Sequence, residues 1–394
     1  MHLNRTTYTL LATTAAGLGL FLAACWETGL GPSDEGGRRI QPALASGNSG
    51  KTPKELWVTS QGGNVIYIRD FKNLSPIDQI NLPRATPSGA GPHIVTFHTP
   101  DFAYVAGMTD GTVYVIDANT REIVHSSKLA PTLVHQVKVS PNGATALVSV
   151  ISTRTVVKMA VDEANRIWSV GPSLDLGAAT GKAPICTVFR VDSERAFVSL
   201  NPSGIAVVDV PTMTYLSEIP TDGFVACGMI KQDADRVVIA STGGGGHIYT
   251  LDMPTETMTD RGTLGAASWH SFVMTPDGTR GFGSSPFSDE VIVIDLTTTP
   301  VTNLGSILFD QVPGRGNNQP DAFGGGEAIY SNRLMVGLRA AGSVASVHAR
   351  NLKLRSIVNL EPPTPFNPMT CGPVGPPTGP GGCAVHGVTA RPRL

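Results

Sequence analysis

Short apolar runs separated by turn residues fill the chain from Lys54 to Leu394, and no stretch of this region shows helical periodicity. Residues 94–129 contain one complete unit. It has a first strand, a turn at Thr99-Pro100-Asp101, the strand FAYVAG, a glycine turn, the strand TVYVID, another turn and a last strand. The first turn recurs as SPNG at 140–143 and as TPDG at 275–278. The pattern therefore predicts a repeat of four β-strands.

The spacing of the units predicts how many there are. First strands are expected to begin near residues 93, 135, 186, 227, 270 and 327, and a period of roughly 40–60 residues with four strands is typical of a β-propeller. The N-terminal runs ELWVTS, NVIYIRD and 78–82 lack a first strand, which CAVHGVTARPRL at the C-terminus can supply. Joining the termini removes two open sheet edges. We therefore expect an all-β, seven-bladed propeller over 54–394, closed by a C-terminal innermost strand in the N-terminal blade.

An aspartate recurs where the third strand ends in six of the seven expected units. Its carboxylate can accept hydrogen bonds from the turn backbone about two residues further on. We interpret these side chains as structural turn caps rather than catalytic acids. They are Asp70, Asp117, Asp162, Asp209, Asp252 and Asp295.

The repeat motifs resemble those of the YVTN family of propellers, within the wider quinoprotein-like and cytochrome-d1-like group. The segments that carry the resemblance are TPDFAYVAG, TVYVIDANT, SPNGATALVSV, IAVVDVPT, TPDGTRGFG and VIVIDLTT. The resemblance covers almost all of residues 54–394 and implies the propeller fold. It does not imply an activity, because such propellers include binding proteins, scaffolds and a few redox enzymes.

Composition excludes some partners. Lys and Arg number 29 against 31 Asp and Glu, so there is no electrostatic reason to expect nucleic-acid binding. The high content of Gly (44) and Pro (30) suits a protein with many tight turns. No Ser-His-Asp order, Walker loop, dinucleotide fingerprint or CxxCH motif is present.

The N-terminus has the pattern of a targeting segment. Arg5 precedes an apolar run over 9–22, and Leu22-Ala23-Ala24-Cys25 resembles a bacterial lipobox, in which the cysteine is lipidated. The alternative is an ordinary signal peptide. We expect a signal over 1–24, a flexible tether over 25–53 and a lipid anchor at Cys25, which places the protein on the periplasmic or extracellular side of a bacterial envelope membrane.

The candidate functional residues lie at the start of the first strands. If the ring closes, one side chain from each blade meets around the axis; these are His93, His135, Cys186, Cys227, His270, Glu327 and His386. Imidazoles, thiols and carboxylates are metal-ligand types. The leading hypothesis makes His93, His135, His270 and His386 ligands of copper, iron or zinc, with Glu327 orienting an imidazole or acting as a base. The alternative is that these are structural polar residues around a water-filled tunnel, since Pro-His-Gly is common at this place in YVTN-type repeats.

The remaining cysteines fit an oxidising compartment. Cys371 and Cys383 bracket a Gly/Pro-rich loop that a disulfide would pin. Cys186 and Cys227 stand on neighbouring blades, and we expect a disulfide there too; two thiolates completing a copper or zinc site are the alternative.

These observations predict a function class and no substrate. We expect an envelope lipoprotein that binds a metal ion or small ligand at the tunnel mouth, with redox chemistry as an extension. A non-catalytic propeller that binds another envelope protein or polymer is the rival hypothesis. Whether the chain is an enzyme is left open by the sequence.

Overall fold

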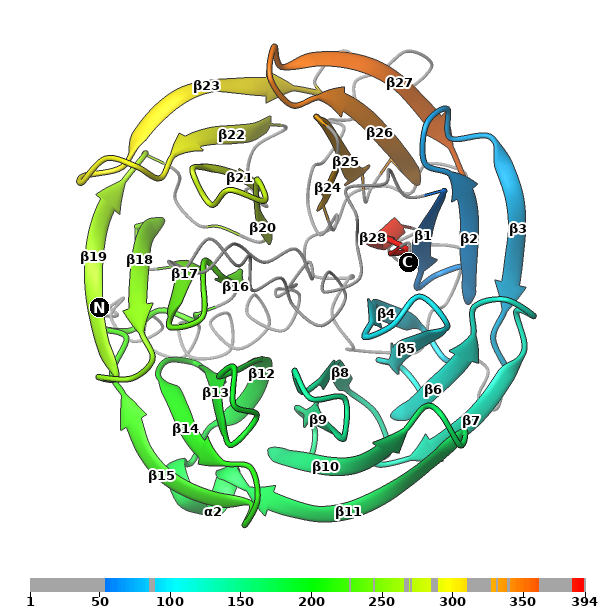
Figure 1. Cartoon of the computed structure of the whole chain (residues 1–394), viewed down its shortest axis with the longest axis vertical. Coiled ribbons are helices and arrows are strands. Elements are labelled where there is room, and N and C mark those ends of the chain that lie inside the picture. Colours follow the sequence, from blue (N-terminus) through cyan, green and yellow to red (C-terminus); the bar gives the residue numbers. More distant parts are fainter. Residues whose placement is uncertain are drawn as a thin grey trace, which may run out of the picture.

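The computed structural model describes residues 54–84, 89–226, 228–243, 245–265, 269, 271–284, 290–309, 332–338, 341–360 and 385–392, together with the backbone of 327–330. In this part of the chain, seven sheets of four antiparallel strands each follow one another around a ring (Figure 1). The seven-bladed propeller expected from the repeat is confirmed. No helix in these ranges is both long and apolar enough to cross a membrane.

The termini share one blade, as expected. Blade 1 has the strand order β28 (Val385–Ala390), β1 (Glu55–Ser60), β2 (Val65–Asp70) and β3 (Pro76–Asn81). The C-terminal strand is therefore the innermost strand of the first blade, and it pairs antiparallel with β1. This pairing closes the ring.

Each of the other blades takes four consecutive strands, from the innermost to the outermost. Blades 2 to 4 are β4 (Pro92–Phe97), β5 (Phe102–Gly107), β6 (Thr112–Asp117), β7 (Ile123–Lys128); β8 (Val134–Val139), β9 (Thr145–Val150), β10 (Thr155–Asp162), β11 (Ile167–Asp175); and β12 (Ala183–Phe189), β13 (Arg195–Asn201), β14 (Ile205–Asp209), β15 (Thr214–Ile219). Blades 5 to 7 are β16 (Met229–Lys231), β17 (Arg236–Ala240), β18 (His247–Asp252), β19 (Thr257–Thr263); β20 (Ser271–Met274), β21 (Arg280–Ser284), β22 (Glu290–Asp295), β23 (Thr302–Leu308); and β24 (Glu327–Tyr330), β25 (Arg333–Leu338), β26 (Ser343–His348), β27 (Lys353–Asn359).

Packing between neighbouring blades explains the apolar runs. The middle strands β5 and β6 are buried at every position, because both faces of a blade lie against other blades. Trp57 and Ile66 of blade 1, for example, share a core with Val95 and Phe97 of blade 2. The outer strand β3 is exposed at all but one position. Continuous apolar runs thus mark the inner strands, and polar strands mark the rim.

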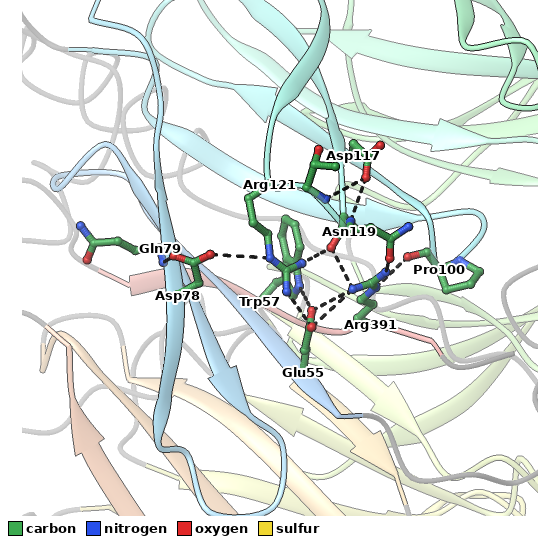
Figure 2. A network of polar contacts seen from close by, with 11 residues as sticks. Glu55, Trp57, Asp78, Gln79, Pro100, Asp117, Asn119, Arg121 and Arg391 are labelled. Atoms are coloured by element: carbon green, nitrogen blue, oxygen red, sulfur yellow. Dashed lines mark hydrogen bonds and ion pairs between the residues drawn. The ribbon is translucent and has the colours of Figure 1, made fainter.

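A polar network reinforces the closure (Figure 2). Arg391, just after β28, donates to the carbonyl oxygens of Pro100 (2.7 Å) and Ala118 (2.8 Å) in blade 2 and lies 3.3 Å from both carboxylate oxygens of Glu55. Arg121 of blade 2 donates to the same carboxylate at 2.6 Å. Burial favours the neutral acid, but hydrogen bonds from Arg121 and Trp57 outweigh it and lower the pKa of Glu55.

The recurring aspartates cap turns, as expected. Each of the six accepts at least one backbone N–H from two or three residues further on. One connection between blades contains a helix, although the sequence shows no helical periodicity there. There β11 extends to Asp175, whose carboxylate caps the short helix α2 (Leu176–Thr180), and β12 begins at Ala183. The local N-cap stabilises a helical turn that hydrophobic periodicity is too short to reveal.

Candidate functional site: a histidine ladder on blades 1 to 3

Three of the predicted ligand residues come together near the axis. His386, His93 and His135 are each the second residue of the innermost strand of blades 1, 2 and 3, namely β28, β4 and β8. The ring centroids of His386 and His93 are 3.8 Å apart, and those of His93 and His135 are 4.5 Å apart. All three side chains are at most 1% exposed. We call these three residues the histidine ladder.

A β-bulge positions each histidine of the ladder. In β4 the pairing passes from Pro92↔Gly107 to Val95↔Val105, so that His93 and Ile94 oppose the single residue Ala106. The register of β8 shifts in the same way at His135, and that of β28 shifts at His386. A bulge bends the strand and re-aims the side chain of the extra residue. Each imidazole is thereby turned onto the next blade of the ring.

Hydroxyl groups help to hold two such bulges. The hydroxyl of Thr59, opposite the bulge of β28, accepts the backbone N–H of Gly387 at 2.6 Å and donates to the carbonyl oxygen of His93 at 2.9 Å. In blade 4, Ser199 likewise accepts the N–H of Cys186 at 2.9 Å. A bulge removes a backbone group from the regular ladder, and a buried N–H needs a partner. The two hydroxyls therefore supply the hydrogen bonds that the backbone N–H groups lose where the strand register is irregular.

His135 has a defined tautomer. Its Nδ1 lies 3.0 Å from the carbonyl oxygen of Ile185 in blade 4. A carbonyl oxygen only accepts, so Nδ1 carries the proton and Nε2 carries the lone pair. Within the described residues Nε2 is buried and has no hydrogen-bond partner. Burial lowers the pKa of His135 to about 4, against the opposing effect of the hydrogen bond to Ile185. The ring is therefore neutral at physiological pH, with a lone pair inside the protein.

His93 has a different kind of partner. Its Nδ1 lies 2.5 Å from the side-chain Nε2 of Gln61, which directly follows β1 in blade 1. The amide, unlike a carbonyl, carries both a donor and an acceptor. Ladder histidines in neighbouring blades are thus oriented by chemically different groups.

The equivalence expected for all seven candidates holds for the three ladder residues and fails for two others. In blade 4 the first bulge residue is Ile185, and Cys186 stands one position later. In blade 7, Glu327 pairs with Val336 as Val95 pairs with Val105 in blade 2. Glu327 therefore stands two positions beyond the place of His93. Sequence spacing could not show this, because equivalent positions are defined by the pairing of each first strand with its neighbour.

The other predicted site residues lie outside the described part of the chain. This applies to His270 and Cys227, to the lipidation site Cys25, to Cys371 and Cys383, and to the side chain of Glu327. Trp269, the residue before His270, is buried, and its indole N–H donates to the carbonyl oxygen of Gly246 at 2.6 Å. Cys186 is buried in β12, and both expected disulfides stay predictions. Among the described residues, no group of three or more His, Cys, Asp or Glu side chains is arranged to hold a metal ion.

Sequence reasoning missed the groups that orient the imidazoles. Gln61 and the carbonyl oxygen of Ile185 belong to blades other than those of the histidines they contact. Gln61 stands at the end of a strand, where a polar residue is ordinary, and a backbone carbonyl leaves no trace in the sequence. No sequence signal could have identified either contact.

Comparison with known proteins supports the fold. No family model and no curated protein matches the chain. Similar solved structures include hydrazine synthase of Kuenenia stuttgartiensis (16% identity, TM-score 0.55, covering 68% of this chain and 87% of that one). Dihydro-heme d1 dehydrogenase NirN in complex with DHE has 13% identity and a TM-score of 0.53, covering 79% and 74%. The β-propeller domain of Myceliophteria thermophila Cps50 (Swd1) has 9% identity and a TM-score of 0.55, covering 79% and 98%.

These likenesses define a class by fold alone. The chain is a seven-bladed β-propeller protein, with distant structural similarity to dihydro-heme d1 dehydrogenase NirN. At identities of 9–16% the shared architecture carries no activity with it. The closer resemblance to YVTN-type repeats stays a prediction from the sequence motifs.

Proposed function

We propose that this propeller binds a transition-metal ion at the histidine ladder. The observation that carries the proposal is the contact of three buried imidazoles on adjacent blades, with the Nε2 lone pair of His135 directed into the protein and without a hydrogen-bond partner among the described residues. A neutral imidazole is the commonest protein ligand of transition metals. Its second nitrogen is usually held by a carbonyl or carboxylate, as Nδ1 of His135 is held by Ile185.

The geometry favours an ion that needs few ligands. Zinc in structural sites takes four ligands, and no three ligand-type side chains in the described ranges are arranged around one point. Monovalent copper is satisfied by two neutral imidazoles. Burying a single positive charge also costs less than burying two, because the desolvation cost of an ion rises steeply with its charge. Cu(I) is therefore the first candidate, with zinc and iron behind it.

The proposed setting is the periplasmic or extracellular side of a bacterial envelope membrane. It rests on the lipobox-like Leu22-Ala23-Ala24-Cys25 and on the polar segment that follows it. Expression with Cys25→Ala tests this part: we expect the parent chain in the membrane fraction and the variant released from it. Equal fractionation of both proteins would contradict the anchor.

Metal titration tests the binding proposal. The purified, metal-free protein is titrated with Cu(I) without oxygen against a chromophoric chelator, and separately with Zn(II) and Fe(II). We expect one Cu(I) per chain, bound more tightly than either divalent ion. His135→Leu and, separately, His386→Gln should weaken binding by about 100-fold or more, because each removes a ligand.

The control is His125→Gln, which changes a histidine on the outer strand β7 that contacts Ser127 and Trp168. It should bind Cu(I) as the parent does. Circular dichroism and thermal melting establish that each variant is folded. Failure of the parent to bind any of the three metals, or full affinity in both ladder variants, would overturn the proposal. A metal-free protein would direct attention to protein partners in the envelope.

A further inference from the structure

The amide of Gln61 lies against a ring nitrogen of His93, and it reaches that ring from another blade. Gln61 belongs to the β1–β2 turn of blade 1, whereas His93 lies in the bulge of β4 in blade 2. Its Nε2 lies 2.5 Å from Nδ1 of His93. The turn is held in place by the N–H of Gly63, which donates to the hydroxyl of Ser60 at 3.0 Å. The amide is thus presented to the imidazole by a fixed piece of backbone.

An amide can satisfy either neutral tautomer of the ring. With its N–H₂ towards the ring, Gln61 donates to Nδ1, so the imidazole proton resides on Nε2 and that nitrogen cannot bind a metal. Turned by half a rotation, the amide presents its oxygen, accepts the proton of Nδ1 and leaves the lone pair on Nε2. The tautomer of His93 is therefore coupled to the orientation of one amide group.

The tautomer of His135, the neighbouring residue of the histidine ladder, is fixed. Nδ1 of His135 faces the carbonyl oxygen of Ile185, which can only accept. In blades 2 and 3 the positions equivalent to Gln61 are Met108 and Ile151, by the pairings of the preceding residues Gly107 and Val150. Both are apolar and buried. Among these three equivalent positions, only the one in blade 1 therefore carries an amide that can either donate to or accept from an imidazole.

From this contrast we infer that Gln61 is a positioning residue that sets the tautomer of His93, and through it the affinity of the ladder for a metal ion. His135 supplies a lone pair at all times. His93 supplies its own only when the amide of Gln61 turns its oxygen to Nδ1. The inference rests on the proposed function for its effect on metal affinity, while its effect on the tautomer stands independently.

Two substitutions separate the amide's two roles. Gln61→Glu replaces it with a carboxylate, which in its ionised form can only accept and so holds the proton on Nδ1. Gln61→Met keeps the length of the side chain and offers no hydrogen bond. Gln79→Glu is the matched control, because it adds the same charge at an exposed position on β3 of the same blade.

The first readout is the tautomer of His93 in metal-free protein, measured by long-range ¹H–¹⁵N NMR on ¹⁵N-histidine-labelled chain and assigned with His93→Gln. We expect the Nε2–H form in the parent and in Gln79→Glu, and the Nδ1–H form in Gln61→Glu. The second readout is Cu(I) affinity. We expect Gln61→Glu to bind about 10-fold more tightly than the parent and Gln61→Met about 10-fold more weakly, the range seen when outer partners of ligands change.

The outcomes distinguish this inference from the proposed function. An unchanged His93 tautomer in folded Gln61→Glu and Gln61→Met would overturn the role of Gln61. A tautomer that follows the substitutions in a protein that binds no metal would sustain the positioning role and remove the metal proposal. A change of affinity in Gln79→Glu equal to that in Gln61→Glu would trace the effect to net charge and also overturn the inference.

Discussion

Arg391 and Glu55 join the two ends of the described chain: the backbone N–H of Arg391 donates to the carbonyl oxygen of Glu55 at 3.0 Å, and its guanidinium lies 3.3 Å from the carboxylate. The two side chains are only 15% and 14% exposed. The contact lies at one end of the β28–β1 ladder. It therefore secures the ring at the point where no covalent connection does.

Loss of this contact should loosen the whole propeller. Arg391→Met removes the ion pair and the donors to Pro100 and Ala118, and we expect it to lower the free energy of unfolding by about 2–3 kcal/mol. Urea denaturation followed by circular dichroism measures the change. Arg190→Met is the control, since Arg190 pairs locally with Asp192 and should cost less than about 1 kcal/mol. Equal losses in both variants would contradict a special role for the closure.

Two glycines with the same backbone angle make a matched test of packing between blades 2 and 3. Gly143 has φ +74°, and a Cβ there would lie 2.6 Å from Nε2 of His98; Gly181 has φ +75° and no described atom within 4 Å of such a Cβ. Gly181→Ala should cost about 1 kcal/mol from backbone strain alone. Gly143→Ala should cost about 1 kcal/mol more, because the ring must also move.

Chemical denaturation of both variants gives the comparison. In a His98→Ala background the extra cost at Gly143 should disappear, because the obstructing ring is gone. An extra cost that persists without the ring would show that the obstruction is backbone rather than His98.

His98 should also make stability depend on pH. Burial, assisted by the charge of Lys138, lowers its pKa from 6.5 to about 4. Between these two values the unfolded chain binds a proton that the folded chain does not, so stability falls as the pH falls from about 6.5 to about 4. In His98→Gln, the loss of unfolding free energy between pH 6.5 and pH 4 should be smaller than in the parent by up to about 3 kcal/mol. Parallel pH profiles for the parent and the variant, measured by urea unfolding, would contradict the assignment.

Glu163 should act in the opposite direction. Burial raises its pKa, even though hydrogen bonds from Thr99 and Tyr104 favour the ionised form. The folded state then holds a proton more strongly than the unfolded state. The contribution of Glu163 to the stability of the folded protein therefore falls as the pH rises through and above 4.5. Glu163→Gln keeps a neutral side chain at every pH. The parent should exceed the variant in stability by more at pH 4 than at pH 7, and thermal melting at the two values measures it; a constant difference would contradict the raised pKa.

Local patterns were sufficient to predict the architecture. The four-strand unit visible in residues 94–129, the leftover strands at the two ends and the turn aspartates all depend on neighbours in the chain. Strand periodicity and turn chemistry are short-range properties. The number of blades and the closure by residues 385–390 follow from them and are confirmed.

Contacts across blades could not be predicted in the same way. The sequence places histidines near the start of three inner strands, but their ring contacts depend on how three blades pack around the axis. The strand pairings of β12 and β24 also place Cys186 and Glu327 outside the expected column, one and two positions beyond the place of His93. A bulge changes the register by one residue, and hydrophobic alternation around a single position does not reveal it.

The amino-acid sequence by itself determined a seven-bladed ring with histidines on its innermost strands, because strand, turn and repeat signals are encoded among neighbouring residues. The tertiary structure alone decided which of those histidines touch and which groups orient them. Gln61 reaches His93, and the carbonyl of Ile185 reaches His135, only after separate blades have packed together. The proton positions that decide what such rings can bind are therefore a property of the assembled propeller.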